Sequence, residues 1–279
     1  MNTTAPQAFA ALVGRADDDR IDLLSAALLI ARAEYPELKV EPYVQRVEAL
    51  ARRVLVQVPD FGDPNESVSA LNRVLFEEEG FRGNREDYYD PRNSFLNDVI
   101  DRKLGIPITL SVVYMEVAKR VGLPLFGVGL PGHFLLKHYD PEGRQVLIDP
   151  YSRGAIISAG ECQAKLDEIY EGRLDLRPEF LVAVGKRQIL TRMLNNLKNI
   201  YASSRSFRKA LPIVDMILAI YPRSPEDVKQ RAMLRYTLND WRGAVDDLED
   251  YLKMSPDASD VDEIRETVLT IRRGMARLN

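Results

Sequence analysis

The feature that most constrains the fold is a segment, residues 105–150, in which one amphipathic helix precedes several short strands. Pro107 suits the first turn of this helix and Gly122 suits its end. Turn residues at 140–143 separate the last two strands. A helix followed by antiparallel strands predicts an α+β domain in which the helix packs on the sheet. The expected strands cover 125–130, 134–139 and 145–148.

This segment carries a histidine and an aspartate at positions suited to catalysis. His133 stands just before the second strand, and Asp149 stands just after the third. If these strands pair through the turn, both side chains lie at the same end of the sheet, where Asp149 can orient the imidazole of His133. The alternative is a His–Asp hydrogen bond with a purely structural role.

The nucleophile that would complete a catalytic triad is missing from its expected place. Thiol catalysis needs a cysteine at the start of the helix, but the only cysteine, Cys162, follows Asp149 and suits a partly buried, inert thiol. Pro107 cannot attack a carbonyl group, and it lacks the N–H that could serve an oxyanion hole. Thr109 and Ser111 are the alternative nucleophiles, although such residues more often cap a helix or face inward.

The N-terminal part is predicted to be helical up to a polar and aromatic loop at 80–95. Loops of this composition often bind ligands, so this one is the first candidate to line a cleft beside the histidine. A hydrogen-bonded structural loop is the competing interpretation. The candidate ligand-binding residues are Asn84, Asp87, Tyr88, Tyr89, Asp90, Arg92 and Asn93. The expected helices cover 20–34, 42–56 and 67–79.

The C-terminal third is helical in pattern and contains an internal repeat. Ala210 recurs as Ala244, a period of 34 residues that resembles the tetratricopeptide repeat, a pair of antiparallel helices per unit. In the second unit Arg231 and Arg235 stand where that family has apolar residues. Residues 260–278 are expected to form a terminal capping helix.

Two motifs before and after the core helix resemble those of transglutaminase-like proteins, in which Gly-x-Cys opens the helix and Gly-(Ile/Leu)-Pro follows it. Here Gly105-Ile106-Pro107 opens the helix, and Gly122-Leu123-Pro124 comes after it. The resemblance implies that His133 and Asp149 are the second and third members of the triad. It also puts Pro107 at the position of the cysteine.

Longer stretches resemble the SirB family of bacterial proteins in the same order along the chain. They include LLIARAEYP, YYDPRNSFLNDVIDRKLGIPITLSVVYMEVAKRVGL and GLPGHFLLKH. The resemblance spans about residues 8–275. It implies a transglutaminase-like, papain-like α+β domain at 1–182, followed by an all-α domain of tetratricopeptide helices with a cap at 187–279.

Composition and spacing exclude several classes of function. A net charge of −4 gives no basic surface for nucleic acid. The longest apolar run, 23–31, is too short to cross a membrane, and the N-terminus lacks a signal-peptide pattern, so we expect a cytoplasmic protein. His133 and His138 point to opposite faces of a strand, so we expect no metal site. The glycine-rich stretch at 127–132 precedes a strand rather than a helix, so we expect no cofactor.

These observations favour a non-catalytic transglutaminase-like protein that acts as a protein-interaction or regulatory module. A peptide or amide ligand would bind near His133 and Asp149, and a protein or peptide partner would bind the repeat helices. The alternative is an amide hydrolase or transamidase that uses Thr109 or Ser111 together with His133 and Asp149.

Overall fold

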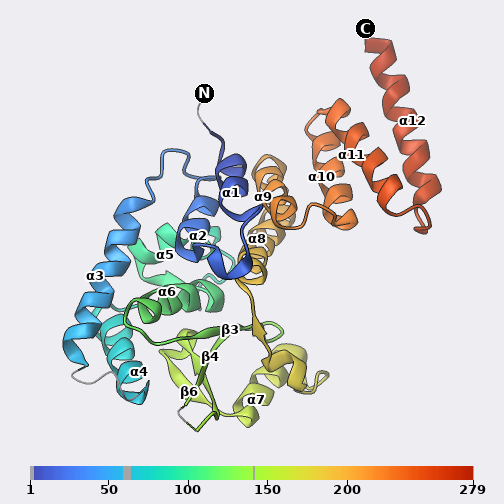
Figure 1. Cartoon of the computed structure of the whole chain (residues 1–279). Helices are drawn as coiled ribbons and strands as arrows, with labels where there is room; N and C mark the ends of the chain where they lie inside the picture. Colours follow the sequence, from blue (N-terminus) through green and yellow to red (C-terminus); the bar gives the residue numbers. More distant parts are fainter. Residues whose placement is uncertain (1–2, 59–63, 141, 279) are drawn as a thin grey trace. The chain divides into compact units, whose positions relative to one another are not determined.

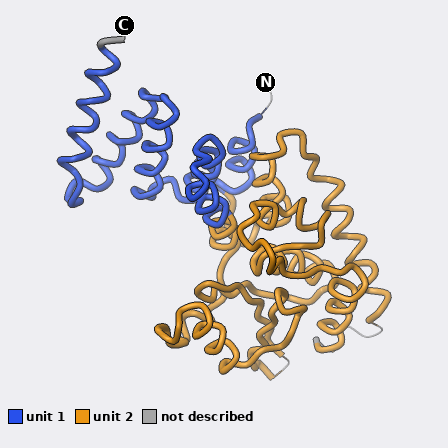
Figure 2. Tube along the Cα trace, turned by 180° about the vertical axis from the view of Figure 1, so that it is seen from behind, with its two compact units in different colours: residues 1–15, 194–279 blue, residues 16–193 orange. Residues whose placement is uncertain are grey.

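The computed structural model describes residues 3–58, 64–140 and 142–278, which form two compact units (Figure 2). One unit comprises residues 16–193, and the other joins residues 1–15 to residues 194–279. Helix α8 (Lys186–Ser203) contributes residues to both. Pro141, within the turn expected at 140–143, lies outside the described residues.

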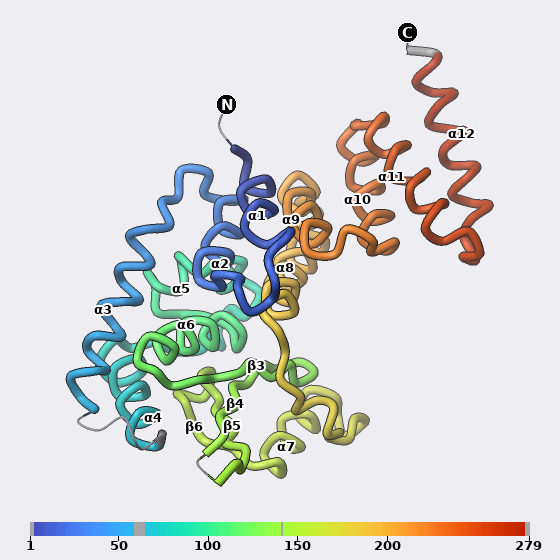
Figure 3. Tube along the Cα trace, viewed as in Figure 1, coloured from blue at the N-terminus to red at the C-terminus, as the bar shows by residue number. Residues whose placement is uncertain are grey.

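The unit of residues 16–193 has the expected α+β architecture, with an antiparallel sheet and surrounding helices (Figures 1 and 3). Among the described residues the main sheet has five strands in the order β6-β5-β4-β3-β7. They are β3 (Phe126–Val128), β4 (Leu135–Tyr139), β5 (Gln145–Asp149), β6 (Ala155–Ile157) and β7 (Ala183–Val184). A separate parallel pair consists of β1 (Arg82–Gly83) and β2 (Leu104–Gly105). The helices are α2 (Leu23–Ala31), α3 (Glu41–Gln57), α4 (Pro64–Asn72), α5 (Leu96–Arg102), α6 (Pro107–Arg120) and α7 (Ala159–Tyr170).

Helix α6 forms the centre of this unit and has the limits that the sequence predicts. Pro107 is its first residue, where the missing N–H costs no hydrogen bond. Gly122 follows its end with a φ of +81°, a left-handed conformation that glycine adopts without strain. The helix is buried on most of its circumference, because it contacts α2, α3, α5 and strand β4.

Strand β4 is covered on both faces, which explains its apolar sequence. Leu135 packs with Cys162 and Leu166 of α7 in a buried cluster. Leu136 and His138 point to the other face, and both are buried as well. Strand β4, which follows His133 and contains His138, therefore lies between helices α6 and α7.

The helix that begins with α4 continues as a π-helix from Arg73 to Glu78, which the 3.6-residue periodicity of the sequence does not indicate. Two acidic residues at its end form ion pairs. Glu79 binds Lys103 at 2.6 Å, and Glu78 binds Arg53 at 2.6 Å. These ion pairs tie the π-helical segment to α3 and to the residue that follows α5.

In the unit of residues 1–15 and 194–279, the regular elements formed by the described residues are all helices, as the repeat pattern predicts. Ala210 and Ala244 are fully buried, so the small side chains lie where helices approach closely. Helix α1, which the sequence analysis did not predict, packs on α9. None of the helices built from described residues has the length and apolar character needed to cross a membrane. Besides the end of α8, the helices are α1 (Ala5–Val13), α9 (Phe207–Ile220), α10 (Pro225–Thr237), α11 (Trp241–Met254) and α12 (Val261–Leu278).

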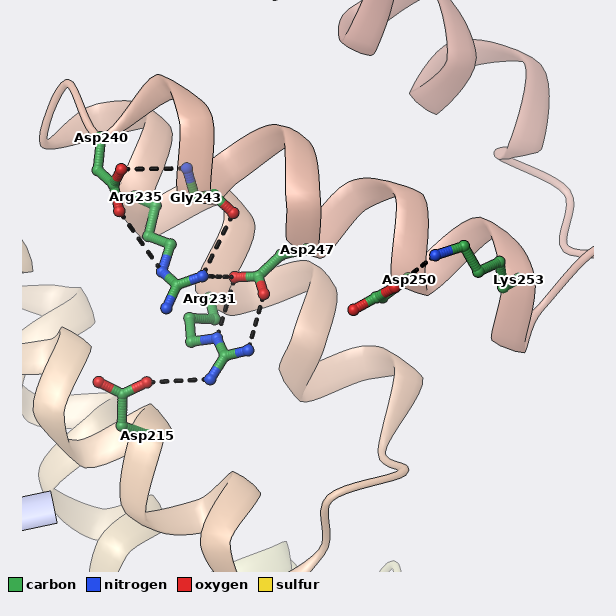
Figure 4. Close-up of polar contacts among 8 residues, drawn as sticks. All are labelled: Asp215, Arg231, Arg235, Asp240, Gly243, Asp247, Asp250 and Lys253. Carbon is green, nitrogen blue, oxygen red and sulfur yellow. Dashed lines mark hydrogen bonds and ion pairs between the residues drawn. The ribbon is translucent and has the colours of Figure 1, made fainter. Parts of the chain in front are cut away.

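The arginines at positions expected to be apolar form an ionic network between three helices (Figure 4). Arg231 of α10 binds both carboxylate oxygens of Asp247 on α11, at 2.7 and 2.9 Å. Arg235 reaches the same carboxylate at 2.9 Å. Arg231 also binds Asp215 of α9 at 3.1 Å. Asp247 is only 3% exposed, so its carboxylate supplies a buried anion to the two arginines that stand at positions expected to be apolar.

Replacing Asp247 by alanine should destabilise the repeat unit by about 2 kcal/mol, because two partly buried guanidinium groups lose their anion. Urea unfolding followed by the fluorescence of Trp241, the only tryptophan, measures this loss. The exposed pair of Asp250 and Lys253 on the same helix gives the control (Figure 4). Asp250→Ala should leave stability almost unchanged, and equal effects of the two substitutions would contradict the role assigned to the network.

Candidate functional site

The structure brings His133 and Asp149 together in the way the sequence predicts. Strands β4 and β5 pair antiparallel with Leu136 opposite Ile148, so the start of β4 lies beside the end of β5. His133 Nε2 lies 3.0 Å from Asp149 Oδ1. Both side chains are buried, the histidine at 7% exposure and the aspartate at 0%.

The carboxylate of Asp149 has every acceptor position occupied. Oδ1 also accepts hydrogen bonds from the backbone N–H groups of Tyr151 (3.0 Å) and Ser152 (3.3 Å). Oδ2 accepts one from the Ser152 hydroxyl at 2.8 Å and pairs with Lys165 Nζ at 2.9 Å. Asp149 therefore caps the turn that follows β5 and links it to helix α7, in addition to holding His133.

Electrostatics keep Asp149 ionised. Burial alone would raise the pKa of this carboxyl, but the hydrogen bond and charge interaction with His133, followed by hydrogen bonds from Lys165 and Ser152, hold the pKa far below its ordinary value. The ammonium of Lys165 neutralises a carboxylate that, in a catalytic triad, would be free to stabilise an imidazolium. His133, Asp149 and Lys165 thus form a three-membered polar cluster, in which Asp149 and Lys165 are an ion pair.

The turn that carries His133 is fixed by an arginine that sequence reasoning missed. Arg192 of α8 donates to the carbonyl oxygens of His133 (2.7 Å) and Leu130 (3.0 Å). Its guanidinium also lies 5.5 Å from the centre of the Phe134 ring. Burial lowers the pKa of Arg192, and neighbouring tyrosines, Tyr88 first, oppose this shift. No local signal marks Arg192, because it is 59 residues away from His133 in the chain.

One aromatic side chain, that of Tyr151, borders the imidazole. The Tyr151 ring meets the His133 ring nearly edge to face, with centroids 5.9 Å apart. A Cβ at Gly83 would come within 2.3 Å of the Tyr151 ring, so this strand position needs glycine. Burial, followed by the neighbouring Tyr151, raises the pKa of Tyr88, which is 38% exposed. Arg85 lies over the Tyr151 ring at 6.0 Å.

The two candidate hydroxyl nucleophiles are engaged or enclosed. Thr109 is fully buried, and its hydroxyl lies 2.8 Å from the carbonyl oxygen of Asn93 and accepts the Ile106 N–H at 3.1 Å. It therefore caps the start of α6. The Ser111 hydroxyl is also buried and has no hydrogen-bond partner among the described residues. The structure gives neither hydroxyl a hydrogen bond to His133 Nδ1, the ring nitrogen that does not face Asp149.

The loop of candidate ligand-binding residues is held together largely by its own hydrogen bonds. Asn84 Nδ2 donates to Asn93 Oδ1 at 3.1 Å, and Asn93 Nδ2 donates to the Asp87 carbonyl oxygen at 2.7 Å. Asp90 pairs with Arg92 at 2.8 Å and with Arg102 of α5 at 3.2 Å. Tyr88 and Tyr89 pack edge to face with centroids 5.3 Å apart, and they are the loop's exposed aromatic residues. A ligand-lining role for the loop stays a prediction. Tyr88 is a loop residue that interacts with Tyr151, the neighbour of His133.

The lone cysteine lies between α7 and the sheet, near enough to Lys165 and Asp149 for their charges to act on its thiol. Cys162 is fully buried in the cluster between α7 and the sheet, and burial raises the pKa of its thiol, so the protonated, unreactive form is favoured. Within the described residues no group of three His, Cys, Asp or Glu side chains could hold a metal ion. His138 Nδ1 is 3.0 Å from the carbonyl oxygen of Pro124, where the ring serves the fold.

Replacing Asp149 by asparagine should destabilise the unit of residues 16–193 by about 3 kcal/mol near neutral pH, because Lys165 and His133 lose their buried anion. The folded-state pKa is depressed, so the contribution is complete above the unfolded value of about 3.9 and fades as the pH falls below it. Urea unfolding of both proteins at several pH values measures the difference.

Asp98 supplies a control of opposite sign. Burial raises the pKa of this carboxyl, and the hydrogen bond from Tyr35 opposes the shift, so its ionisation destabilises the fold as the pH rises. The stability difference between the wild type and Asp98→Asn should therefore increase as the pH falls. A constant difference for Asp149→Asn across the same range would contradict a paired, ionised carboxylate.

Comparison with known proteins agrees with this architecture. A family model described as the transglutaminase-like superfamily matches residues 41–195, and one described as the tetratricopeptide repeat matches residues 197–268. A UPF0162 protein of Xylella fastidiosa is 38% identical over 252 residues, which cover 89% of both chains. A UPF0162 protein of Vibrio cholerae is 28% identical over 241 residues, covering 86% of this chain and 88% of its own.

A mammalian protein is similar in sequence to part of this chain. F-box only protein 21 of Mus musculus is 30% identical over 184 residues, which cover 62% of this chain and 28% of the mouse protein. The first family model covers more than half of the chain, and the Xylella relative matches most of its length. The chain therefore belongs to the transglutaminase-like superfamily and to the family of UPF0162 proteins.

Proposed function

We propose that this protein is a non-catalytic, SirB-type member of its family that acts as a protein-interaction or regulatory module. The transglutaminase-like unit holds a peptide or carboxamide beside His133. The repeat helices bind a protein partner. In this proposal His133 and Asp149 serve as a structural anchor and as one wall of a ligand site.

The observation that carries the proposal is the saturation of Asp149. A triad aspartate stabilises the charge that histidine gains when it takes a proton from the nucleophile. Here Lys165, 2.9 Å away, already supplies a positive charge to that carboxylate. Pro107 stands at the start of α6, where a thiol would be needed, and the Thr109 hydroxyl is committed to backbone groups.

The aromatic border of His133 supports ligand binding in place of catalysis. Tyr151 packs against His133, Tyr88 lies near Tyr151, and Arg85 adds a cation over the Tyr151 ring. His133 Nδ1 has no hydrogen-bond partner among the described residues, so it is the ring nitrogen left to meet a ligand. An amide has the donor, acceptor and flat shape that such a surface recognises.

The relationship to F-box only protein 21 also supports a module. The shared segment makes up 28% of the mouse protein, so there it is one part of a longer chain. A domain that recurs as a part of different chains suits a role in recognition.

A groove on the repeat unit is the proposed place for a protein partner. It has a volume of about 170 Å³, and Met233 of α10, 46% exposed, lies at its edge. An apolar side chain from a partner would cover Met233 and fill the groove. Its lining residues are Lys198, Ala202, Phe207, Ala210, Gln230, Met233, Leu234 and Thr237.

The alternative function is an amide hydrolase or transamidase with Ser111 or Thr109 as nucleophile. The buried hydroxyl of Ser111, which has no hydrogen-bond partner among the described residues, is the observation that favours it. Such a hydroxyl needs a base within hydrogen-bond reach, and His133 Nδ1 is the candidate base.

The intact protein should not turn over amide substrates. Labelled-amine incorporation into glutamine peptides and a peptidase assay should both give rates equal to buffer, because no activated nucleophile faces the histidine. His133→Ala should leave these background rates unchanged. Turnover by the wild type that His133→Ala abolishes, in a variant whose circular dichroism is unchanged, would establish the alternative.

Partner capture should depend on the repeat groove. Met233→Glu should remove the proteins that the intact wild-type chain retains in a pull-down, because it puts a charge into an apolar contact. Leu269→Glu changes a similarly exposed apolar side chain on α12, 43% exposed, and should leave capture intact. If the captured set is the same for all three proteins, the groove is not the docking site. If His133→Ala also leaves that set unchanged, the N-terminal unit serves only to support the repeats.

A further inference from the structure

A cleft opens in the unit of residues 16–193, at the end of helix α6. It has a volume of about 340 Å³, which lies within the range of small-molecule sites. None of the residues described above as bordering His133 lines it. Its walls are Leu23 of α2, Met115, Glu116 and Lys119 of α6, the segment Gly122, Leu123, Pro124 and Leu125, and Lys186 of α8.

The walls of this cleft are mainly apolar. Leu23 and Leu123 are buried at its base, with exposures of 1% and 5%. Met115 and Leu125 are half-buried and present apolar surface to the opening. A ligand with a hydrocarbon body would remove this surface from water, which is favourable in proportion to the area covered.

The polar groups of the cleft carry a positive charge. Lys119 is exposed, and its ammonium has no ion-pair partner among the described residues. Lys186 Nζ donates to the carbonyl oxygens of Asp19 and Ile21, both at 2.7 Å, which leaves a third N–H. Glu116 is the one acidic residue in the lining, and Arg120 neutralises it at 2.6 Å.

Neighbouring negative groups are engaged elsewhere. The last carbonyl oxygens of α6 would repel an anion, but Gly122 and Leu123 donate backbone N–H groups to Lys119 O (3.3 Å) and Ala118 O (3.0 Å). Asp18 accepts the backbone N–H of Lys186 at 2.8 Å. Asp22 caps helix α2 through Ser25. Among the residues that line the cleft, the charges without an acidic partner are therefore cationic.

We propose that this cleft binds a small amphipathic carboxylate. The hydrocarbon part lies against Leu23, Met115 and Leu125, and the carboxylate meets the ammonium groups of Lys119 and Lys186. This arrangement needs both features of the cleft, because a wholly polar anion would leave the apolar wall in water, and a neutral hydrocarbon would leave the lysines unused.

Octanoate is the probe, titrated into the intact protein carrying ¹³C-labelled methionine methyl groups. The Met115 signal, identified among the seven methionines by its loss in Met115→Leu, should shift and saturate. Octanol and octylammonium should bind more weakly than octanoate. Lys119→Gln should weaken octanoate binding about threefold to fivefold, the size expected for an exposed ion pair.

Two further variants complete the test. Leu125→Trp fills the opening and should remove the saturable shift. Lys39→Gln makes the same charge change at an exposed lysine outside the cleft and should have no effect. A Met115 signal that does not saturate, octylammonium binding equal to that of octanoate, or an affinity that Lys119→Gln leaves unchanged would overturn the proposal.

Discussion

The rest of the transglutaminase-like unit depends on the hydrogen bonds and the ion pair that the carboxylate of Asp149 makes. This carboxylate is fully buried and joins three parts of the fold: the turn that ends at His133, the turn after β5, and helix α7 through Lys165. A buried anion is tolerated only when it is paired and hydrogen-bonded. The same carboxylate therefore explains why the histidine remains in place without a thiol opposite it.

The features that could be predicted from the sequence rest on local signals. Pro107 and the glycine after α6 set the limits of that helix, because one residue suits a first turn and the other a left-handed position. Two strands joined by a short turn put His133 and Asp149 at the same end of the sheet. The 34-residue period predicted the helix pairs around Ala210 and Ala244.

The features that could not be predicted depend on pairs distant in sequence. Lys165 and Arg192 carry no motif, and their roles follow from where α7 and α8 meet the His133 turn. Arg231 stands where the repeat pattern predicts an apolar residue. The fold accommodates it because Asp247 on the next helix supplies an anion. A polar residue at an apolar position is thus consistent with the repeat once its partner is known. The π-helix after α4 also leaves no mark on a 3.6-residue pattern.

The central claim is that no activated nucleophile faces His133. The most direct test is the intact mass of the protein after incubation with a fluorophosphonate, which acylation-competent hydroxyls attack to form a stable adduct. The account predicts an unmodified mass for both the wild type and His133→Ala. A single adduct that maps to Ser111 or Thr109 and is absent from His133→Ala would contradict it.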